Sequence, residues 1–472
     1  MKARRISPYL PNAVPEVRER MLKELGLEEI DQLFSEVPEH LRFKGRLNLP
    51  DPLPDEYSIR RHLDGLLAKN RNCHDNLCFL GAGCARHFIP AVCDEIAAHG
   101  QFLTAYSADP YADHGKWQAL FEYFSLMAEL LDLEVVGGAM YDGAQAAATA
   151  VRTAHRLTGR RQVLLPRLMN PETRQVIENY VKGLDEPVVE LVYLEHHPES
   201  GLLDLADLKA KLGPQTAGVL MENPTFLGGI EVNAAEIGEL VRSQGAEFMV
   251  YCDPISLGVL APPAQYGATL ACGDIHPLGI HLNCGGGQSG FIATPGEMRY
   301  IVELKDKMYG VTETTVPGEY GFGHVLFDRT SFGSREKAKE FTGTGTNLWA
   351  ITAGVYLSLM GPQGMAEVGR TIMARSRYAQ RRLTGLPGVR ARFTAPFFKE
   401  FVLDFSESGL TVAEINAALL ERGIFGGLDL AERFPELKGC ALYCVTETIT
   451  RQDIDRLVAA LGEILPGGRG EV

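Results

Sequence analysis

Six cysteine and histidine side chains lie close together in one short segment and raise the question of a metal site. Four, five and eight residues separate the successive cysteines, and these spacings match no standard zinc or iron–sulfur pattern. Free cysteine is also a common small core residue. We therefore expect no bound metal in this segment, which contains Cys73, His74, Cys78, Cys84, His87 and Cys93.

An aspartate and three histidines further along the chain could perform acid–base chemistry. Asp253 ends an apolar run and precedes a proline. Such an aspartate can reach into a site at the end of a strand, although it is more often a turn former. His276, His281 and His324 could converge with it on one pocket. The alternative for each histidine is hydrogen-bonded packing, and both interpretations stay open.

Two glycine-rich segments could bind phosphate through backbone N–H groups, residues 285–290 and residues 342–347. The second leads directly into a helical pattern, and the amino terminus of a helix favours an anion. A tight turn is the alternative for both. The sequence contains no nucleophile elbow, Walker loop or Rossmann glycine pattern, so nothing favours a hydrolase, an ATPase or a nicotinamide enzyme.

The composition and hydrophobic pattern of the chain predict three regions that would position these residues. Residues 1–75 are rich in charge and proline and form an amino-terminal arm, which either wraps a partner subunit or caps its own chain. In residues 76–345, short apolar runs alternate with helical patterns, which is typical of a mostly parallel sheet covered on both faces. We expect its strands at Gln162–Leu165, Val188–Leu194, Ala217–Met221, Phe248–Cys252, Thr269–Cys272 and Gly290–Ala293.

Residues 346–472 predict a separate, smaller α+β domain. A long helical pattern is interrupted by Gly-Pro-Gln-Gly at 361–364 and then resumes. Strands at Glu400–Phe405 and Ala441–Val445 alternate with two helices after it.

Composition excludes several classes of partner. The 472 residues contain 46 Lys and Arg against 60 Asp and Glu, a net charge of −14, which disfavours nucleic acid as a partner. No apolar run of about 18 residues is present, so we expect no membrane span. The amino-terminal residues lack an apolar segment of the secretory type, and nine scattered cysteines indicate reduced thiols. We expect a cytoplasmic protein.

Short motifs along nearly the whole chain resemble a known family. They include FLGAG at 79–83, QALFEY at 118–123, MYDGA at 140–144, YLSLMGPQG at 356–364 and RGIFGGLDL at 422–430. Together they resemble subunit 1 of the two-subunit glycine dehydrogenase (decarboxylating), the P-protein of the glycine cleavage system. The resemblance implies an α/β fold of the fold-type I pyridoxal-phosphate-transferase class, with a mostly parallel large domain and a smaller α+β domain. It also implies assembly with a homologous subunit 2, as a heterotetramer.

The resemblance assigns the Schiff-base lysine to subunit 2. No lysine occurs between Lys211 and Lys305, the region after Asp253 in which that lysine normally lies. We therefore expect no catalytic residue in this chain, and pyridoxal phosphate bound mainly by the partner. The resemblance implies that the partner decarboxylates glycine and passes the aminomethyl group to a lipoyl carrier protein.

The same resemblance implies which residues of this chain contact cofactor or substrate. Thr344, Gly345 and Thr346 would reach the phosphate of the partner's cofactor, and Asp253 and His276 would contact a cofactor. Tyr106 would contact substrate, although the surrounding loop, TAYSADPYADHG at 104–115, departs from the family pattern. Because of this departure, two alternatives stay open: a non-catalytic scaffold or regulatory subunit, and a diverged paralogue that acts on another small amine or amino acid.

Overall fold

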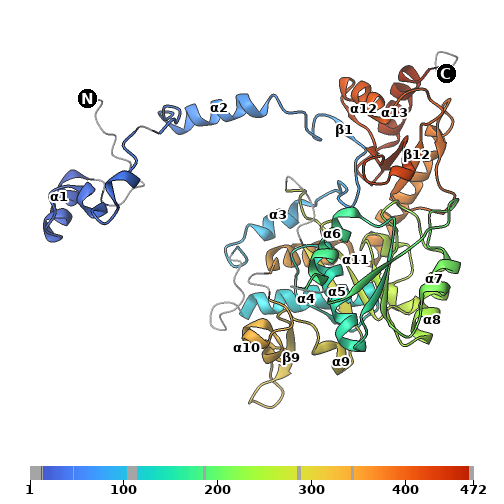
Figure 1. Ribbon diagram of the computed structural model, residues 1–472, viewed down its shortest axis with the longest axis horizontal. Helices are drawn as coiled ribbons and strands as arrows, with labels where there is room; N and C mark the ends of the chain where they lie inside the picture. Colours follow the sequence, from blue (N-terminus) through green and yellow to red (C-terminus); the bar gives the residue numbers. More distant parts are fainter. Residues whose placement is uncertain are drawn as a thin grey trace. The chain divides into compact units, whose positions relative to one another are not determined.

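The computed structural model describes residues 12, 14–45, 47–103, 114–183, 188–283, 289–341 and 345–466. The chain divides into two compact units, Met1–Arg71 and Asn72–Val472. In the first unit, helices α1 (Pro15–Glu24) and α2 (Glu56–Leu67) are joined by the short 3-10 helices η1 (Ile30–Phe34) and η2 (Glu39–Leu41) (Figure 1). None of its described residues is buried, so this unit has no core of its own.

The second unit is built on a seven-stranded, mostly parallel sheet, as expected from the sequence. Its strand order is β2-β8-β7-β6-β5-β3-β4. All pairs from β7 through to β4 are parallel, whereas β8 is antiparallel to both of its neighbours. The strands are β2 (Val135–Val136), β3 (Gln162–Pro166), β4 (Glu190–Leu194), β5 (Thr216–Glu222), β6 (Glu247–Tyr251), β7 (Leu270–Asp274) and β8 (Gly290–Thr294).

One face of this sheet is covered by α5 (Gly143–Thr158), whose buried positions are mostly alanines. Ala147, Ala150 and Ala154 are fully buried, and their small side chains let the helix approach strands β3, β5 and β7 closely. Helix α6 (Pro171–Val181) packs beside α5 in the same layer. The first residue of α5, Gly143, lies directly beside Tyr251 and Asp274, at the strand ends that carry the polar residues described below.

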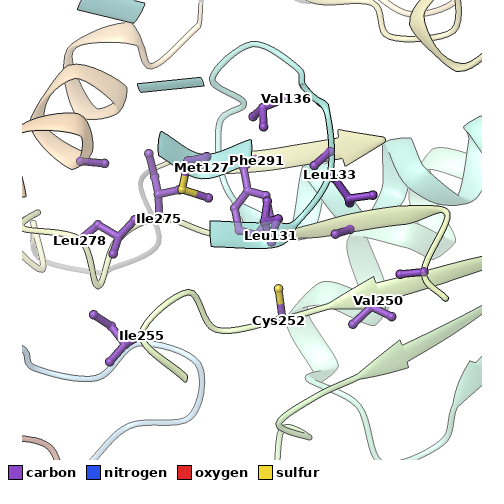
Figure 2. Close-up of a cluster of buried hydrophobic side chains, with 14 of the residues drawn as sticks. Met127, Leu131, Leu133, Val136, Val250, Cys252, Ile255, Ile275, Leu278 and Phe291 are labelled. Carbon is purple, nitrogen blue, oxygen red and sulfur yellow. The ribbon is translucent and has the colours of Figure 1, made fainter. Parts of the chain in front are cut away.

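The other face packs against α4 (His114–Leu131) and forms the largest core. Met127 and Leu131 of α4 meet Phe291 of β8, and Val250 and Ile255 extend the cluster (Figure 2). The side chains that α4 buries recur at three- and four-residue intervals: Trp117, Leu120, Phe124, Met127 and Leu131. Helices α3 (Ala91–Ala97), α7 (Leu205–Lys211) and α8 (Ala234–Ser243) also contribute side chains to this core.

Several elements were not expected from the sequence. An antiparallel hairpin joins β9 (Tyr309–Glu313) to β10 (Tyr320–His324), flanked by the short helices α9 (Met298–Ile301) and α10 (Ser331–Ser334). A two-residue parallel pair joins β1 (Leu77–Cys78) to β13 (Ile424–Phe425). The two-residue pair is too short to give a periodic hydrophobic signal, and the hairpin strands give none because they bury only Tyr309.

The carboxy-terminal elements form a second, antiparallel sheet in the order β11-β12-β15-β14. Two helices cover it, α12 (Val412–Glu421) and α13 (Arg451–Ile464), and each begins with a threonine capping box. The strands are β11 (Arg390–Ala391), β12 (Glu400–Asp404), β14 (Leu428–Asp429) and β15 (Cys440–Cys444).

Helix α11 (Asn347–Leu383) contributes to both cores. Gly361 (φ 57°, ψ −177°) breaks the helical path directly before Pro362, as the sequence predicted. Before the break, Ala350 and Tyr356 are buried in the core against α4, and after it Leu383 is buried in the carboxy-terminal core. None of the helices in the described ranges is both long and apolar enough to cross a membrane.

Candidate functional site

A cavity opens at the carboxyl ends of the parallel strands, where the carboxy-terminal sheet meets the large one. Glu222 and Asp274 are the last residues of β5 and β7, and Asp253 follows β6 by two residues. Lys399 and Glu400 enter from the start of β12. Ligands of open α/β sheets bind at this edge, so the cavity is the candidate site.

A buried ion pair joins the two sides of this cavity. Lys399 Nζ lies 2.6 Å from Asp253 Oδ2, and the side chains are 11% and 15% exposed. Burial alone would raise the pKa of Asp253, but the Lys399 ammonium, His87 and the Ile255 N–H together hold the pKa below its ordinary value. Burial opposes the charge of Lys399 as well, yet Asp253 and other nearby acids raise the pKa of its ammonium group. Both groups are therefore charged at neutral pH.

His87 and Glu447 extend this pair into a chain of four polar groups. Lys399 Nζ lies 3.4 Å from His87 Nε2, and His87 Nδ1 lies 2.9 Å from Glu447 Oε2. An ammonium group can only donate, so Nε2 accepts and Nδ1 carries the proton that it donates to Glu447. Burial raises the pKa of Glu447, but His87 and the Phe88 N–H lower it below its ordinary value overall. The chain thus runs Glu447–His87–Lys399–Asp253.

Three further carboxyl groups line the cavity, and burial raises the pKa of each. The pKa of Glu222 rises to about 7, although the backbone N–H groups of Phe226 and Asn170 donate to it. The pKa of Asp274 likewise rises to about 7, against the N–H groups of His276 and Gly143. Burial also raises the pKa of Glu400. The cavity therefore has more acidic groups than the single lysine can balance.

The three predicted histidines do not converge on Asp253. His276 is buried near it, and burial together with the nearby His87 and Lys399 lowers its pKa to about 3, so its ring is neutral. His281 Nε2 instead lies 2.8 Å from Asp94, and both side chains are exposed. The His324 ring contacts the Trp117 ring, with ring centroids 4.5 Å apart. Sequence spacing could not separate these three environments.

The cysteine segment forms no metal cluster. Of its four cysteines only Cys93 is buried, whereas Cys73, Cys78 and Cys84 are partly exposed. Across the described residues, no group of three or more His, Cys, Asp or Glu side chains could hold a metal ion.

The described part of the predicted phosphate segment lies against Ala139 and Met140. Thr346 Oγ1 is 2.7 Å from the Met140 carbonyl oxygen and 2.6 Å from Ser289 Oγ. Gly345 approaches Ala139 so closely that a Cβ atom would lie 2.9 Å from its carbonyl oxygen. Neither Gly345 nor Thr346 is among the described residues that line the cavity. Tyr106 and Thr344, also predicted to contact substrate or cofactor, lie outside the described residues.

Comparison with known proteins decides the family. The family model of the glycine cleavage system P-protein matches residues 7–461. The chain belongs to the glycine cleavage system P-protein family. Among its relatives are two proteins named probable glycine dehydrogenase (decarboxylating) subunit 1. The Staphylothermus marinus protein is 38% identical over 466 residues, covering 97% of this chain and 98% of the relative. The Moorella thermoacetica protein is 39% identical over 458 residues, covering 97% and 99%.

Solved structures agree with this membership and with the expected fold. A crystal structure of glycine decarboxylase (P-protein) of the glycine cleavage system, in inhibitor-bound form, matches with a TM-score of 0.85 at 33% identity. It covers 97% of this chain and all of that chain. A sphingosine-1-phosphate lyase from Burkholderia pseudomallei matches at 13% identity with a TM-score of 0.64, over 90% and 94% of the two chains, and supports the fold alone. The chain has the fold-type I architecture that the sequence predicted.

The residues of this P-protein family member do not fit pyridoxal phosphate in its own cavity. The cofactor requires a lysine for the Schiff base and an acid facing its pyridine nitrogen. The lysine in the described lining, Lys399, is held as an ammonium group against Asp253, the acid that would face the pyridine. At the start of α5, Asp142 accepts from the Gln145 N–H and Asp274 from the Gly143 N–H. Carboxyl groups therefore already occupy the donors that a phosphate would need.

Sequence reasoning missed Lys399, Glu222 and Glu400, and it assigned His87 only to a possible metal cluster. Lys399 and Glu400 stand side by side inside the apolar run FFKEFVL at 397–403. Two adjacent charges in a run that is otherwise apolar are a detectable signal, because buried charges need partners. Glu222 ends an apolar run directly before Asn-Pro, as Asp253 ends one before Pro, and could have been found in the same way.

Proposed function

We propose that this chain is the subunit 1 partner in a pyridoxal-phosphate-dependent glycine decarboxylase complex, and that it completes the active site of a subunit 2 that carries the Schiff-base lysine. Pyridoxal phosphate, bound mainly by subunit 2, supplies the electron sink for the loss of carbon dioxide from glycine. The aminomethyl group then passes to a lipoyl carrier protein. The chain's own contribution is to bind and orient, through Tyr106 and residues 344–346.

The observation that carries this proposal is the Lys399–Asp253 ion pair. It places an internal cation opposite the acid that a pyridine nitrogen would face, in a chain that otherwise has the fold of the P-protein. Together with the lysine-free region between Lys211 and Lys305, it supports a division of labour in which the cofactor-bearing lysine belongs to another chain.

The exposed amino-terminal unit supports assembly with that partner. Seventeen large apolar side chains of its described part are exposed, and none of its described residues is buried. At about half exposure each, they offer apolar area on the order of 1,000 Å², which is enough for a specific interface. We assign this surface to subunit 2. These side chains are Val14, Met21, Leu25, Ile30, Leu33, Phe34, Val37, Leu41, Phe43, Leu47, Leu49, Leu53, Tyr57, Ile59, Leu63, Leu66 and Leu67.

The direct test compares this chain alone, subunit 2 alone and the mixture in glycine–bicarbonate exchange. The expected result is exchange by the mixture alone. In parallel, the isolated chain is titrated with pyridoxal phosphate, reduced with borohydride and weighed intact, and no stoichiometric adduct is expected. Exchange by this chain without a partner, or one adduct per chain, would contradict the proposal.

A second function, a non-catalytic scaffold, is favoured by the contacts of Thr346. Its hydroxyl group is already hydrogen-bonded inside the chain, which is the arrangement of a structural residue. Turnover at limiting pyridoxal phosphate that survives replacement of Thr346 by alanine, in a complex of unchanged stoichiometry, would favour the scaffold. A loss of turnover in that complex favours completion of the partner's site.

A further inference from the structure

Ser289 and Thr346 form a partly buried hydroxyl pair whose hydrogen-bond directions can be assigned. Thr346 Oγ1 is 2.7 Å from the Met140 carbonyl oxygen, which can only accept, so the single Thr346 proton is donated there. Ser289 Oγ, 2.6 Å away, must then donate to Thr346 Oγ1. Ser289 is fully buried and Thr346 is half-buried, so the Ser289 end of the pair is shielded from water.

The hydroxyl pair is attached to two hydrogen-bonded backbone segments of the large domain. Met140 and Gly290 form an isolated antiparallel bridge, with N–H···O distances of 3.0 and 3.1 Å in the two directions. Ser289 directly precedes Gly290, and its carbonyl oxygen accepts from the Ile275 N–H at 2.8 Å. Thr346 is therefore attached at the start of β8 through two neighbouring points, Met140 and Ser289.

The position of Thr346 before α11 makes this use of its hydroxyl group informative. Thr346 is the N-cap residue of α11, where a threonine side chain ordinarily accepts from a backbone N–H of the first turn. It makes no such bond here, because the side chain points to Met140 and Ser289 instead. The chain thus forgoes a helix cap and fixes the backbone of Gly345 and Thr346 against Ala139 and Met140.

We propose that Ser289 and Thr346 are positioning residues, which hold the Gly345–Thr346 turn in the orientation that the partner subunit's cofactor site requires. This inference rests on the proposed function. The inference gives Thr346 a different role from direct contact through its side chain. Its hydroxyl group donates to the Met140 carbonyl oxygen, so the backbone of Gly345 and Thr346 would face the partner's cofactor. Ser289, which no sequence pattern singled out, becomes the second member of the pair.

The test uses the chain assembled with subunit 2 and three single variants. Thr346→Val removes the hydroxyl group and keeps the shape, Ser289→Ala removes the donor, and Thr346→Ser keeps the hydroxyl group. For Thr346→Val and Ser289→Ala, we expect the pyridoxal phosphate concentration for half-maximal activity to rise about five- to tenfold, as for the loss of one hydrogen bond. For Ser289→Ala, which lies outside the segment assigned to binding, the activity at saturating cofactor should change less than about twofold. Thr346→Ser should behave like the unaltered chain.

Amide hydrogen exchange of the isolated chain tests the anchoring separately. The amides of residues 345–350 should exchange faster in Thr346→Val and Ser289→Ala than in Thr346→Ser. Faster exchange with an unchanged cofactor requirement would overturn the positioning role, and so would unchanged exchange. Failure of the unaltered chain to activate subunit 2 would instead refute the proposed function, and the exchange data would still report on the anchoring.

Discussion

Lys399 Nζ and Asp253 Oδ2 lie 2.6 Å apart, although the two residues lie next to different sheets and 146 positions apart along the chain. Asp253 follows strand β6 of the large sheet, and Lys399 directly precedes strand β12 of the carboxy-terminal sheet. The Lys399 ammonium group thus balances the Asp253 carboxylate at the carboxyl ends of the parallel strands. The pair also fixes the carboxy-terminal sheet at the cavity, so it should be important for stability.

Replacement of Lys399 by methionine should destabilise the chain by about 3–5 kcal/mol, because it leaves the Asp253 carboxylate buried without its cation. Urea unfolding of the isolated chain measures this loss. The double variant Lys399→Met, Asp253→Asn removes both charges and should recover a large part of it. A double variant that is less stable than the sum of the two single changes would contradict this view of the pair.

Stability should fall as pH rises from about 5 to about 8, in part because of Glu222. Its folded-state pKa, about 7, lies above the ordinary value of 4.5, so the folded state holds the proton more tightly. Its contribution is complete below the unfolded-state pKa and is lost as pH rises through 7. Glu222→Gln lacks this loss. From pH 5 to pH 8, the free energy of unfolding of the unaltered chain should therefore fall by about 1 to 3 kcal/mol more than that of the variant.

Urea midpoints at the two pH values test this prediction, with Glu239→Gln as the control. Glu239 is an exposed glutamate on α8, so its replacement should leave the pH dependence unchanged. Parallel pH curves for Glu222→Gln and the unaltered chain would rule out Glu222 as a source of the slope.

Helix α2 should contribute its apolar face to the interface with subunit 2. Ile59, Leu63 and Leu66 recur at four- and three-residue intervals and are 43%, 49% and 47% exposed. Leu63→Gln should weaken association with subunit 2 by about tenfold in Kd. Arg61, two positions away, lies on the opposite side of the helix, so Arg61→Gln is the matched control. Sedimentation of the mixture measures both, and equal Kd values for the two variants would remove α2 from the interface.

Gly290 should not tolerate a methyl group. A Cβ atom there would lie 2.1 Å from the Asp142 carbonyl oxygen, which belongs to the backbone and cannot move aside cheaply. Gly290→Ala should therefore cost about 2 kcal/mol or more in unfolding free energy. Gly213→Ala, where a Cβ atom meets nothing within 4 Å, should change stability by less than about 0.5 kcal/mol. Equal melting temperatures for the two variants would be inconsistent with this close approach.

The large sheet was predictable because each of its long strands is a local signal. The runs that became β3, β5, β6 and β8 are apolar on both faces and end at Gly, Pro, Asp or Asn, which gives strand positions within about two residues. The break in α11 at Gly361 was equally local. The parallel pair of β1 and β13 joins residues nearly 350 positions apart, and no local pattern encodes such a pairing.

The candidate site was predictable only in part, for a related reason. Asp253 stands out because it ends an apolar run, whereas the importance of Lys399 depends on a partner 146 positions away. Thr346 was correctly placed before a helix, but the direction of its side chain is set by Met140 and Ser289 from two other segments. Sequence spacing specifies which residues share an element, and side-chain partners across elements require the fold.

Helix α11 has a consequence for how the molecule unfolds. Because Tyr356 is buried in one core and Leu383 in the other, neither core can lose its packing without exposing part of the same helix. The two lobes of residues 72–466 should therefore behave as one cooperative unit, with a single melting transition. A disturbance in either lobe reaches the other along this helix, whose first residue directly follows Thr346.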